Sequence, residues 1–405
     1  MTSLSLQDIQ SLLRSTLGDE LTVESYITED LLPPGENYGS IMSSVHVIIK
    51  NHKQGKSEEL QLVAKSPPPV EMQREITDCS IIFRKEIFMY SKLIPFYQNL
   101  EIASGVRKED VFKVSPMCYG SKLSVHSGDS DDYDAVILLE NLKPSGYYCV
   151  DRRFGCDLAH ARLAVRTMAR FHALGMAAKE KDPDFFEVVK AEAKAIDIVN
   201  PEMWEALFQQ RIKDITDDPE LEEYHEACRQ ALSQKMFESW KAVPSEPWST
   251  IVHADFWTNN MMFRDNSEGE PEDMKLVDFQ TYLFASPMRE LTFFVTGGLE
   301  LDAIDHIDEL IDLYYDTLIG RLKLLSCNVE PYSRRSFEEK VREDAYVEIV
   351  HNVAMIKIVT QDIHEKGAEA PDLINLLQSH DNNEIYERRL RKLVRTYGEK
   401  GWLKK

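Results

Sequence analysis

The chain has 405 residues, of which 43% are hydrophobic, so it is long enough for two lobes sharing a cleft and has the composition of an ordinary globular protein. Its formal net charge of −22 would repel phosphate backbones and anionic membranes, which argues against nucleic acid and membrane partners. The N-terminus has no basic region followed by an apolar core, and the chain has no apolar run of roughly eighteen residues, which predicts a cytoplasmic protein.

Apolar residues recur at helical spacing near the N-terminus. Ile9, Leu12, Leu13 and Leu17 share one side of such a helix, and Gly18 is a suitable stop. The pattern predicts a packing helix within residues 1 to about 30, before the first lobe. Six cysteines are scattered along the chain without a Cys-x-x-Cys pair, which predicts reduced, structural thiols.

A glycine-bearing turn precedes the first strand-like segment, residues 45–49. The turn contains Gly35, Tyr38 and Gly39, and the backbone amides of such a turn can approach phosphates closely. An ordinary surface turn explains these residues equally well. A second strand, residues 60–65, stops before a run of prolines, because proline cannot continue a hydrogen-bonded ladder.

Lys65 ends that second strand. In kinases a lysine at the end of a Val-Ala strand neutralises nucleotide phosphates, and an acidic residue on a helix holds it extended. The segment 83–94 has apolar residues at helical spacing, and Glu86 lies beside its apolar face. We therefore predict that Glu86 pairs with Lys65. The alternative is that Glu86 is a solvated helix charge.

The apolar run 134–142 has the length of a strand and ends in polar residues. In a two-lobed chain this segment would cross from the small lobe to the large one. If the chain resembles a kinase, backbone groups around Glu140 and Leu142 would meet the adenine edge of a nucleotide, a contact that any residue type can supply.

Beyond this crossing the pattern becomes helical. A stripe from Ala161 to His172 predicts a buried helix, with His172 as a core histidine. A long helix is expected over 301–324, with an acidic edge that is either solvated or faces a cationic acceptor. A helix that includes 347–363 and a basic amphipathic helix around 388–395 close the chain.

The most informative stretch is 251–280. Short apolar segments at 261–263 and 274–277 flank a polar stretch, which predicts a strand, a loop and a return strand. The polar residues at the strand ends can converge on one spot; they are His253, Asp255, Asn260 and Asp278.

Phosphoryl transfer uses this combination of side chains. One carboxylate orients or accepts the proton of the acceptor hydroxyl, while an amide oxygen and a second carboxylate hold magnesium against the phosphates. These roles fit Asp255 for the acceptor and Asn260 with Asp278 for Mg²⁺. Zinc bound by His253 and Asp255 is a weaker alternative, since no third His or Cys lies at ligand spacing.

The sequence His253-Ala-Asp255-Phe-Trp-Thr-Asn-Asn260, followed by Val-Asp278-Phe-Gln280, resembles the insect ecdysteroid-kinase-like family, relatives of choline and aminoglycoside kinases. The resemblance implies an α+β, two-lobed protein-kinase-like fold, with a small antiparallel-sheet lobe at 1–140 and a mainly helical lobe at 141–405. It implies a monomeric, ATP- and Mg²⁺-dependent small-molecule kinase.

The resemblance also implies roles for single residues. Gly35, Tyr38 and Gly39 would form the nucleotide loop, Lys65 would contact the phosphates, and His253 would brace the catalytic loop. Gln280 replaces the flexible glycine of protein kinases, which argues against a protein substrate. The implied acceptor is a hydroxyl of an ecdysteroid or another hydroxylated hormone or xenobiotic. A cationic alcohol and a non-catalytic nucleotide- or hormone-binding protein are the alternatives.

Overall fold

The computed structural model describes residues 5–31, 40–51, 55–67, 79–125, 133–195, 201–233, 239, 242–361 and 382–403. These residues form two compact units. Unit 1 consists of the described parts of 1–95 and 115–148, and unit 2 of those of 96–114, 149–367 and 371–405. No helix within the described ranges is long and apolar enough to cross a membrane.

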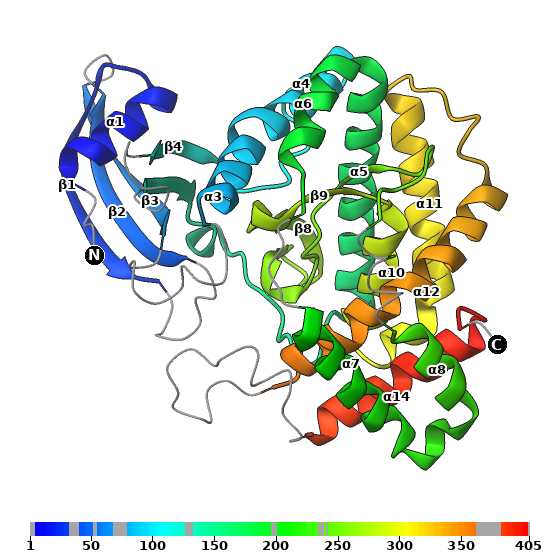
Figure 1. The fold of residues 1–405 in the computed structure, drawn as a ribbon. Coiled ribbons are helices and arrows are strands. Elements are labelled where there is room, and N and C mark those ends of the chain that lie inside the picture. The colour runs from blue at the N-terminus through cyan, green and yellow to red at the C-terminus, as the bar shows by residue number, and fades with distance from the viewer. Residues whose placement is uncertain are drawn as a thin grey trace. The chain divides into compact units, whose positions relative to one another are not determined.

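Unit 1 is built on a five-stranded antiparallel sheet with the order β1-β2-β3-β5-β4 (Figure 1). Alternate residues of its strands face one hydrophobic core, as the two-residue period of a strand requires. Helix α1 contributes Ile9, Leu12 and Leu13 to that core. The strands are β1 (Leu21–Asp30), β2 (Ile41–Asn51), β3 (Lys56–Ser66), β4 (Cys118–Val125) and β5 (Tyr133–Glu140).

Helix α1 spans Leu6–Leu17, as the apolar spacing predicted. Ser5 and Asp8 form a capping box at its start, and Gly18 ends it with a φ of 99°. The sequence prediction missed β1, which follows directly after this helix. Most of its residues are exposed and polar, so the strand has little of the hydrophobic alternation that marks a half-buried strand.

The helix predicted at 83–94 is present as part of a longer helical segment. It begins as α3 (Cys79–Phe88), passes through a π-helical turn, η1 (Met89–Leu93), and continues as α4 (Ile94–Ala103). Phe83 and Tyr90 are buried as expected, while Ile87 is half-buried. A short 3-10 turn, η2 (Lys143–Ser145), follows β5.

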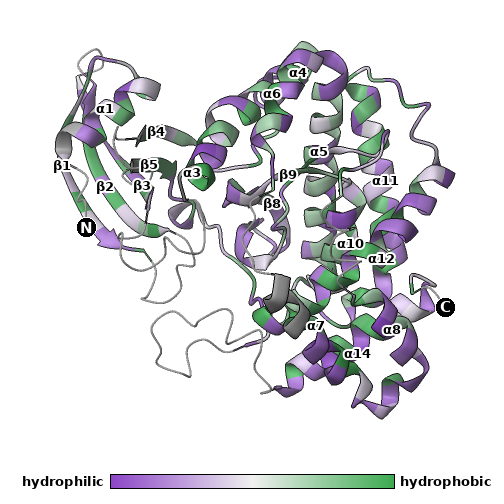
Figure 2. Ribbon diagram, viewed as in Figure 1, coloured by the Kyte–Doolittle hydropathy of each residue, from purple (hydrophilic) through white to green (hydrophobic). Residues whose placement is uncertain are grey.

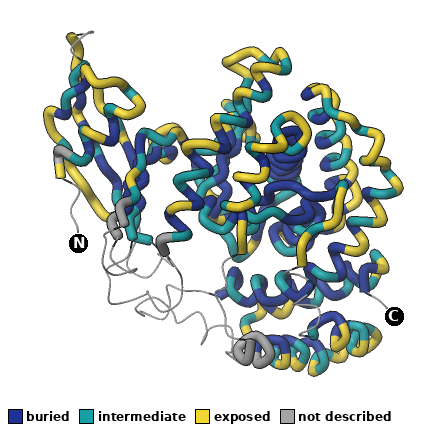
Figure 3. Tube along the Cα trace, turned by 45° about the horizontal axis from the view of Figure 1, so that its top comes forward, coloured by how far each residue is buried: buried dark blue, intermediate teal, exposed yellow. Residues whose placement is uncertain are grey.

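Unit 2 is mainly helical, and α5 (Leu158–Lys181) lies at its centre, where the trace in Figure 3 is buried. The predicted stripe from Ala161 to Phe171 is buried in this helix. The other α-helices are α6 (Pro183–Glu192), α7 (Pro201–Thr216), α8 (His225–Ala231), α10 (Pro287–Gly297), α11 (Ile307–Leu324), α12 (Arg334–Val359) and α14 (Glu384–Glu399).

Short elements in unit 2 carry the polar residues that the sequence singled out. Strands β6 (Thr250–Val252) and β9 (Leu283–Ala285) pair with each other, as do β7 (Met261–Asp265) and β8 (Pro271–Leu276). All four strands pair antiparallel. The 3-10 turns are η3 (Pro219–Tyr224), η4 (Thr258–Asn260), η5 (Phe279–Thr281) and η6 (Ala303–His306).

Two helix boundaries differ from the prediction. The helix expected from residue 301 begins at Ile307, because Ala303–His306 form a 3-10 turn first. The helix expected around 347 begins earlier, at Arg334, where the Ser333 side chain accepts a hydrogen bond from the Ser336 N–H and caps the N-terminus. The first turns of α12 are strongly charged, so their apolar spacing is a weak signal.

The basic helix α14 is amphipathic, and hydrophilic and hydrophobic residues alternate along it in Figure 2. Its charges pair within unit 2: Lys392 contacts Asp305, and Arg395 lies 2.5 Å from Glu220. Asp305 belongs to the predicted acidic edge, whose residues are exposed. This basic run therefore forms intramolecular ion pairs at the surface of unit 2.

The cysteines with described side chains form no disulfide bonds; they are Cys118, Cys149, Cys156, Cys228 and Cys327. Burial raises the pKa of the Cys228 thiol to about 12 and that of the Cys118 thiol to about 11. These thiols are therefore protonated at neutral pH.

Candidate active site

The predicted strand, loop and return strand are present in unit 2 (Figure 1). His253 and Asp255 follow β6, Asn260 ends the turn before β7, and Asp278 follows β8. The backbone N–H of Val277 donates to the carbonyl oxygen of Asn260 at 3.1 Å. This bond holds the segment that leads to Asp278 against the loop that carries Asp255.

Asn260 also fixes the orientation of Asp255. Its side-chain Nδ2 donates to Oδ2 of Asp255 at 2.7 Å and to the Asp255 carbonyl oxygen at 3.0 Å. Because Nδ2 is used in this way, the amide oxygen of Asn260 is the atom that can serve as a metal ligand.

The carboxyl group of Asp255 has a raised pKa of about 6. Burial is the main cause, and the nearby carboxylate of Asp278 is the second, because both disfavour the charged form. Asp278 adopts the left-handed conformation, with a φ of 64° and a ψ of 61°. The side-chain Nε2 of Gln280 donates to Oδ2 of Asp278 at 3.3 Å. The two aspartates thus lie close enough to interact electrostatically.

His253 is fully buried, and its Nε2 donates to the carbonyl oxygen of Val277 at 3.0 Å. Its ring packs on Phe279, with the centroids 4.8 Å apart. Within the described residues its Nδ1 has no hydrogen-bond partner. These contacts join the start of the catalytic loop to the segment that carries Asp278, so His253 makes a bracing contact.

Glu290 on α10 supports the loop from the other side. Its Oε1 accepts a 2.7 Å hydrogen bond from the N–H of Ala254, a residue with a φ of 65°. Its Oε2 lies 2.8 Å from Nε2 of His172, whose Nδ1 lies 2.7 Å from the hydroxyl of Tyr314. His172 is therefore a fully bonded core histidine, as predicted, and it fixes Glu290.

Lys65 and Glu86 lie in unit 1 and form the predicted contact. The Nζ of Lys65 on β3 lies 2.6 Å from Oε2 of Glu86 on α3. The two side chains are 4% and 1% exposed. A buried ammonium group and carboxylate offset each other's charge, so the pair keeps Lys65 extended along its strand.

The segment after β5 is held by hydrogen bonds within unit 1. The N–H of Glu140 donates to the Met117 carbonyl at 2.8 Å, and the N–H of Asn141 donates to the Gln61 carbonyl at 3.0 Å. Leu142 is buried. Its carbonyl accepts from the N–H of Ser145 at 3.1 Å.

The predicted nucleotide loop is not described by the structure. Gly35, Tyr38 and Gly39 lie outside the described residues.

A small pocket adjoins the loop next to Asp255. Its lining includes Ala254 and Phe256, which flank Asp255, together with Phe293 of α10 and Glu348 and His351 of α12. The rings of Phe293 and His351 stack at 4.4 Å with an interplanar angle of 10°. The Nδ1 of His351 lies 2.6 Å from Glu348. The charge of His351 acts to lower the pKa of Asp255, against the larger effect of burial.

The model of the ecdysteroid kinase-like family matches residues 34–327 of the sequence. This chain belongs to the ecdysteroid kinase-like family. The predicted family and fold class, an antiparallel sheet in one unit and helices in the other, are confirmed. As a member of this family the protein is a small-molecule kinase that uses ATP and acts on a hydroxyl group.

Solved structures of several kinases are similar to this ecdysteroid kinase-like protein. The ethanolamine kinase of Plasmodium vivax has 8% identity and a TM-score of 0.38, covering 92% of this chain and 82% of its own. A spectinomycin phosphotransferase in complex with ADP and spectinomycin has 12% identity and a TM-score of 0.42, with coverages of 96% and 98%. A microcompartment-associated aminopropanol kinase has 10% identity and a TM-score of 0.43, with coverages of 99% and 99%. Comparison with curated proteins gives no significant match.

Sequence reasoning missed three residues that surround the catalytic loop of this ecdysteroid kinase-like protein. Glu290, Phe293 and His351 come from α10 and α12, far along the chain from Asp255. The place of Glu290 after Pro287, at the start of a helix that follows the loop, was the one available signal.

Proposed function

We propose that this kinase transfers the γ-phosphate of ATP to a hydroxyl of an ecdysteroid or another hydroxylated hormone or xenobiotic, with Asp255 orienting or deprotonating that hydroxyl. The proposal rests on the environment of the Asp255 carboxylate. One oxygen is fixed by Asn260, and the pKa is about 6. A carboxylate with a pKa near neutrality, held in one orientation, has the properties of a general base.

In the proposed reaction the acceptor oxygen forms a bond to the γ-phosphorus while the bond from that phosphorus to the β–γ bridging oxygen breaks. ADP is the leaving group, and the hydroxyl proton passes to the carboxylate of Asp255. A pKa of about 6 leaves most of this carboxylate ionised at neutral pH, ready to take the proton. His253 has its Nε2–H bonded to the Val277 carbonyl, so it braces the loop.

Asn260 and Asp278 fit a bound Mg²⁺. This ion prefers one or two carboxylate or amide oxygens together with substrate phosphates. The repulsion between Asp278 and Asp255 that raises the pKa of Asp255 is a local excess of negative charge, which a divalent cation relieves. Among the described residues no three His, Cys, Asp or Glu side chains form a metal cluster, so a protein-only site is not built here. Bound Mg²⁺ would neutralise charge on the phosphates.

The remaining assignments concern the nucleotide. Lys65 would contact its phosphates, with Glu86 holding the lysine in place. Backbone groups near Glu140 and Leu142 would meet the adenine. The turn with Gly35, Tyr38 and Gly39 would cover the phosphates, as the family resemblance implies.

A cationic alcohol is the second candidate acceptor. The carboxylates of Glu290 and Glu348 line the pocket beside Asp255, which favours a positive charge. Both already accept hydrogen bonds, and Arg289 lines the same pocket. The excess of negative charge available to a cation is therefore small. We accordingly favour an uncharged, hydroxylated acceptor over a cationic alcohol.

The test is thermal unfolding with and without Mg²⁺ and ATP, beside an Asp278→Ala variant. A ligand that binds only the native state stabilises it by about 2.7 kcal/mol at about a hundred times its Kd. We expect a shift that needs Mg²⁺ and disappears in Asp278→Ala. Asp255→Asn should retain the shift and lose phosphoryl transfer. Turnover in Asp255→Asn would remove Asp255 from its role, and the absence of any shift would support the non-catalytic binding protein.

A further inference from the structure

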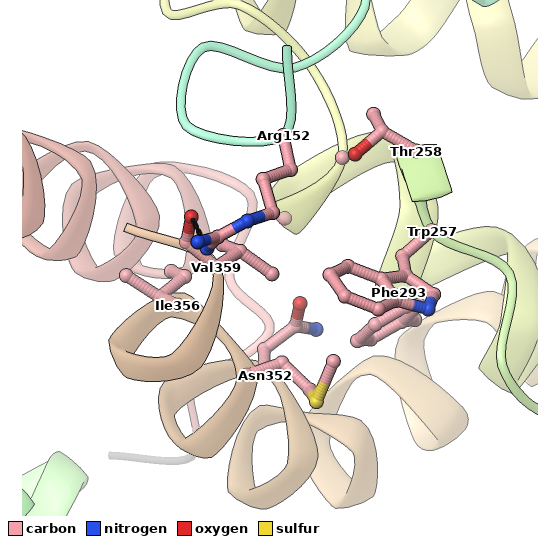
Figure 4. Close-up of a pocket in the computed structure, with 10 residues that line it drawn as sticks. Arg152, Trp257, Thr258, Phe293, Asn352, Ile356 and Val359 are labelled. Carbon is pink, nitrogen blue, oxygen red and sulfur yellow. Dashed lines mark hydrogen bonds between the residues drawn. The ribbon is translucent and has the colours of Figure 1, made fainter. Parts of the chain in front are cut away.

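A second cavity in unit 2 lies behind the catalytic loop, between α10 and α12 (Figure 4). Its walls include Trp257 of the loop, Phe293 of α10, and Asn352, Ile356 and Val359 of α12. The cavity has a volume of about 20 Å³. That is room for one water molecule or one group of similar size, such as a hydroxyl.

Asn352 gives this mostly apolar cavity a polar wall. It is fully buried, and its amide points into the cavity in Figure 4. Its Nδ2 donates to the hydroxyl of Tyr397 at 3.2 Å, whereas its Oδ1 has no hydrogen-bond donor among the described residues. A buried acceptor left without a donor destabilises the protein, so this oxygen favours any occupant that carries an O–H or N–H.

The backbone of α10 leaves room for this oxygen. A Cβ at Gly297 would lie only 2.6 Å from Oδ1 of Asn352, so a residue other than glycine would displace the amide. The Nε1–H of Trp257 is likewise buried and has no acceptor within the described part of the chain. The cavity therefore offers one unbonded acceptor, Oδ1 of Asn352, on walls that are mostly apolar apart from Arg152 and Thr258.

The cavity is linked to the reacting group through the loop itself. The N–H of Trp257 donates to the carbonyl oxygen of Asp255 at 3.1 Å, so one wall is formed by a residue two positions after Asp255 and bonded to it. Phe293 lines both this cavity and the pocket beside Ala254 and Phe256. Phe293 is therefore the wall that the two cavities share, and a molecule whose hydroxyl meets Asp255 would have to turn this ring aside to reach the second cavity with another of its groups.

We propose that this cavity receives a second hydroxyl of the acceptor, which donates to Oδ1 of Asn352 while the carbon that bears it packs on the rings of Trp257 and Phe293. The inference rests on the proposed function and specifies its acceptor as an apolar molecule with at least two hydroxyls. Arg152 is the one charged residue in the described lining, and no carboxylate is present there. A cationic group would find no counter-charge in this cavity.

The experiment measures kcat and KM with ATP for ecdysone and for ecdysone analogues that each lack one hydroxyl. The test variant is Asn352→Leu, and the matched control is Tyr397→Phe, which removes the hydroxyl bonded to Nδ2 of Asn352 and leaves Oδ1 in place. Losing one neutral hydrogen bond corresponds to about a three- to tenfold loss in kcat/KM. We expect that loss of kcat/KM for ecdysone in Asn352→Leu. The analogue that lacks the hydroxyl bound by Asn352 should show no such loss. Tyr397→Phe should have near-normal kinetics.

Val359→Leu is a second variant, which adds a methylene to the cavity wall and leaves Asn352 in place. It should raise KM for ecdysone and leave KM for the same deoxy analogue unchanged. The ATP-dependent thermal shift serves as the control that this variant is folded. Equal losses for all analogues, or none in Asn352→Leu, would mean that the cavity holds only a structural water and would overturn the inference. The inference would also be overturned if the wild-type protein showed the ATP-dependent shift but neither bound nor phosphorylated any of these compounds.

Calorimetric binding of ecdysone in the absence of nucleotide separates this inference from the proposed function. If the ATP shift is absent while ecdysone binds and Asn352→Leu weakens that binding, the kinase function fails and the hydroxyl site stands. If the ATP shift is present and ecdysone binding is insensitive to Asn352→Leu, the kinase function stands and the site fails.

Discussion

The backbone N–H of Ala254 donates a 2.7 Å hydrogen bond to Oε1 of Glu290, and this bond holds a residue whose φ is 65°. A non-glycine residue in the left-handed region costs about 1–2 kcal/mol, so it persists where its surroundings compensate. Since Ala254 precedes Asp255, Glu290 sets the path of the catalytic loop from a different helix.

Glu290 can be tested with two substitutions. Glu290→Gln keeps a carbonyl oxygen for the Ala254 N–H and can donate to Nε2 of His172, so kcat should stay within a few-fold of the wild type. Glu290→Leu removes both bonds, and we expect kcat to fall about tenfold or more, which corresponds to about 1.4 kcal/mol or more. Steady-state kinetics check this. Nucleotide-dependent thermal shifts show whether each variant is folded, and wild-type kcat in Glu290→Leu would contradict the loop-positioning role.

The buried pair of Lys65 and Glu86 gives a prediction about stability. Removing one partner of a buried ion pair costs about 3–5 kcal/mol, while replacing both with apolar residues is often neutral. Glu86→Leu should therefore lower the denaturant midpoint strongly, and Lys65→Met combined with Glu86→Leu should restore much of it. Both variants should lose the ATP-dependent shift. A double variant no more stable than Glu86→Leu alone would argue against direct coupling of the two charges.

The raised pKa of Asp255, about 6 against a usual 3.8, predicts the pH dependence of turnover. The general base must be ionised, so kcat/KM should rise as the pH increases through about 6 and then level off. The neighbours that influence this group are Asp278, His253 and His351. In protein without nucleotide, the titration profile of the Asp255 carboxyl group followed by NMR should shift toward lower pH in an Asp278→Asn variant, because one of the two causes of the raised pKa is removed. A profile that ignores this substitution would contradict the electrostatic coupling.

The same pKa predicts a stability effect in protein without nucleotide or Mg²⁺. A carboxyl group whose pKa is raised in the folded state binds its proton more tightly there than in the unfolded chain. The free energy of unfolding therefore falls as the pH rises from about 4 through about 6. Asp255→Asn removes this loss, so it should stabilise the protein by about 1–3 kcal/mol at pH 8 and leave it unchanged below pH 4. Urea unfolding at the two pH values measures the difference. Equal stability of both proteins at pH 8 would contradict the raised pKa.

Gly175 on α5 marks a close approach between this helix and β6. A Cβ there would lie 2.2 Å from Oγ1 of Thr250 and 3.1 Å from the hydroxyl of Tyr97. Overpacking of this kind costs about 1–3 kcal/mol, so Gly175→Ala should destabilise the protein by that amount. Thr250→Ala removes the hydroxyl and should recover part of the loss in the double variant. Thermal unfolding of the three variants checks this, and additive losses would show that the two residues do not clash.

Several features of this protein followed from local sequence. The loop with Asp255 and Asn260 and the return strand before Asp278 were predictable, because spacing within one strand, loop and strand places these residues at neighbouring ends. The pairing of Lys65 with Glu86 was predictable because kinases place a lysine at the end of such a strand and a glutamate on the following helix. The exposed strand β1 was not predictable from the sequence, since it lacks hydrophobic alternation.

Other features depended on the tertiary structure. Glu290, His351 and Asn352 resemble surface or helix residues when only their sequence neighbours are known, and the packing of α10 and α12 around the catalytic loop brings them to the site. The raised pKa of Asp255 likewise follows from burial and from the position of Asp278. Local spacing determined which residue types could act, whereas burial and contacts between distant helices decided their charge, their partners and the shape of the pocket beside Asp255.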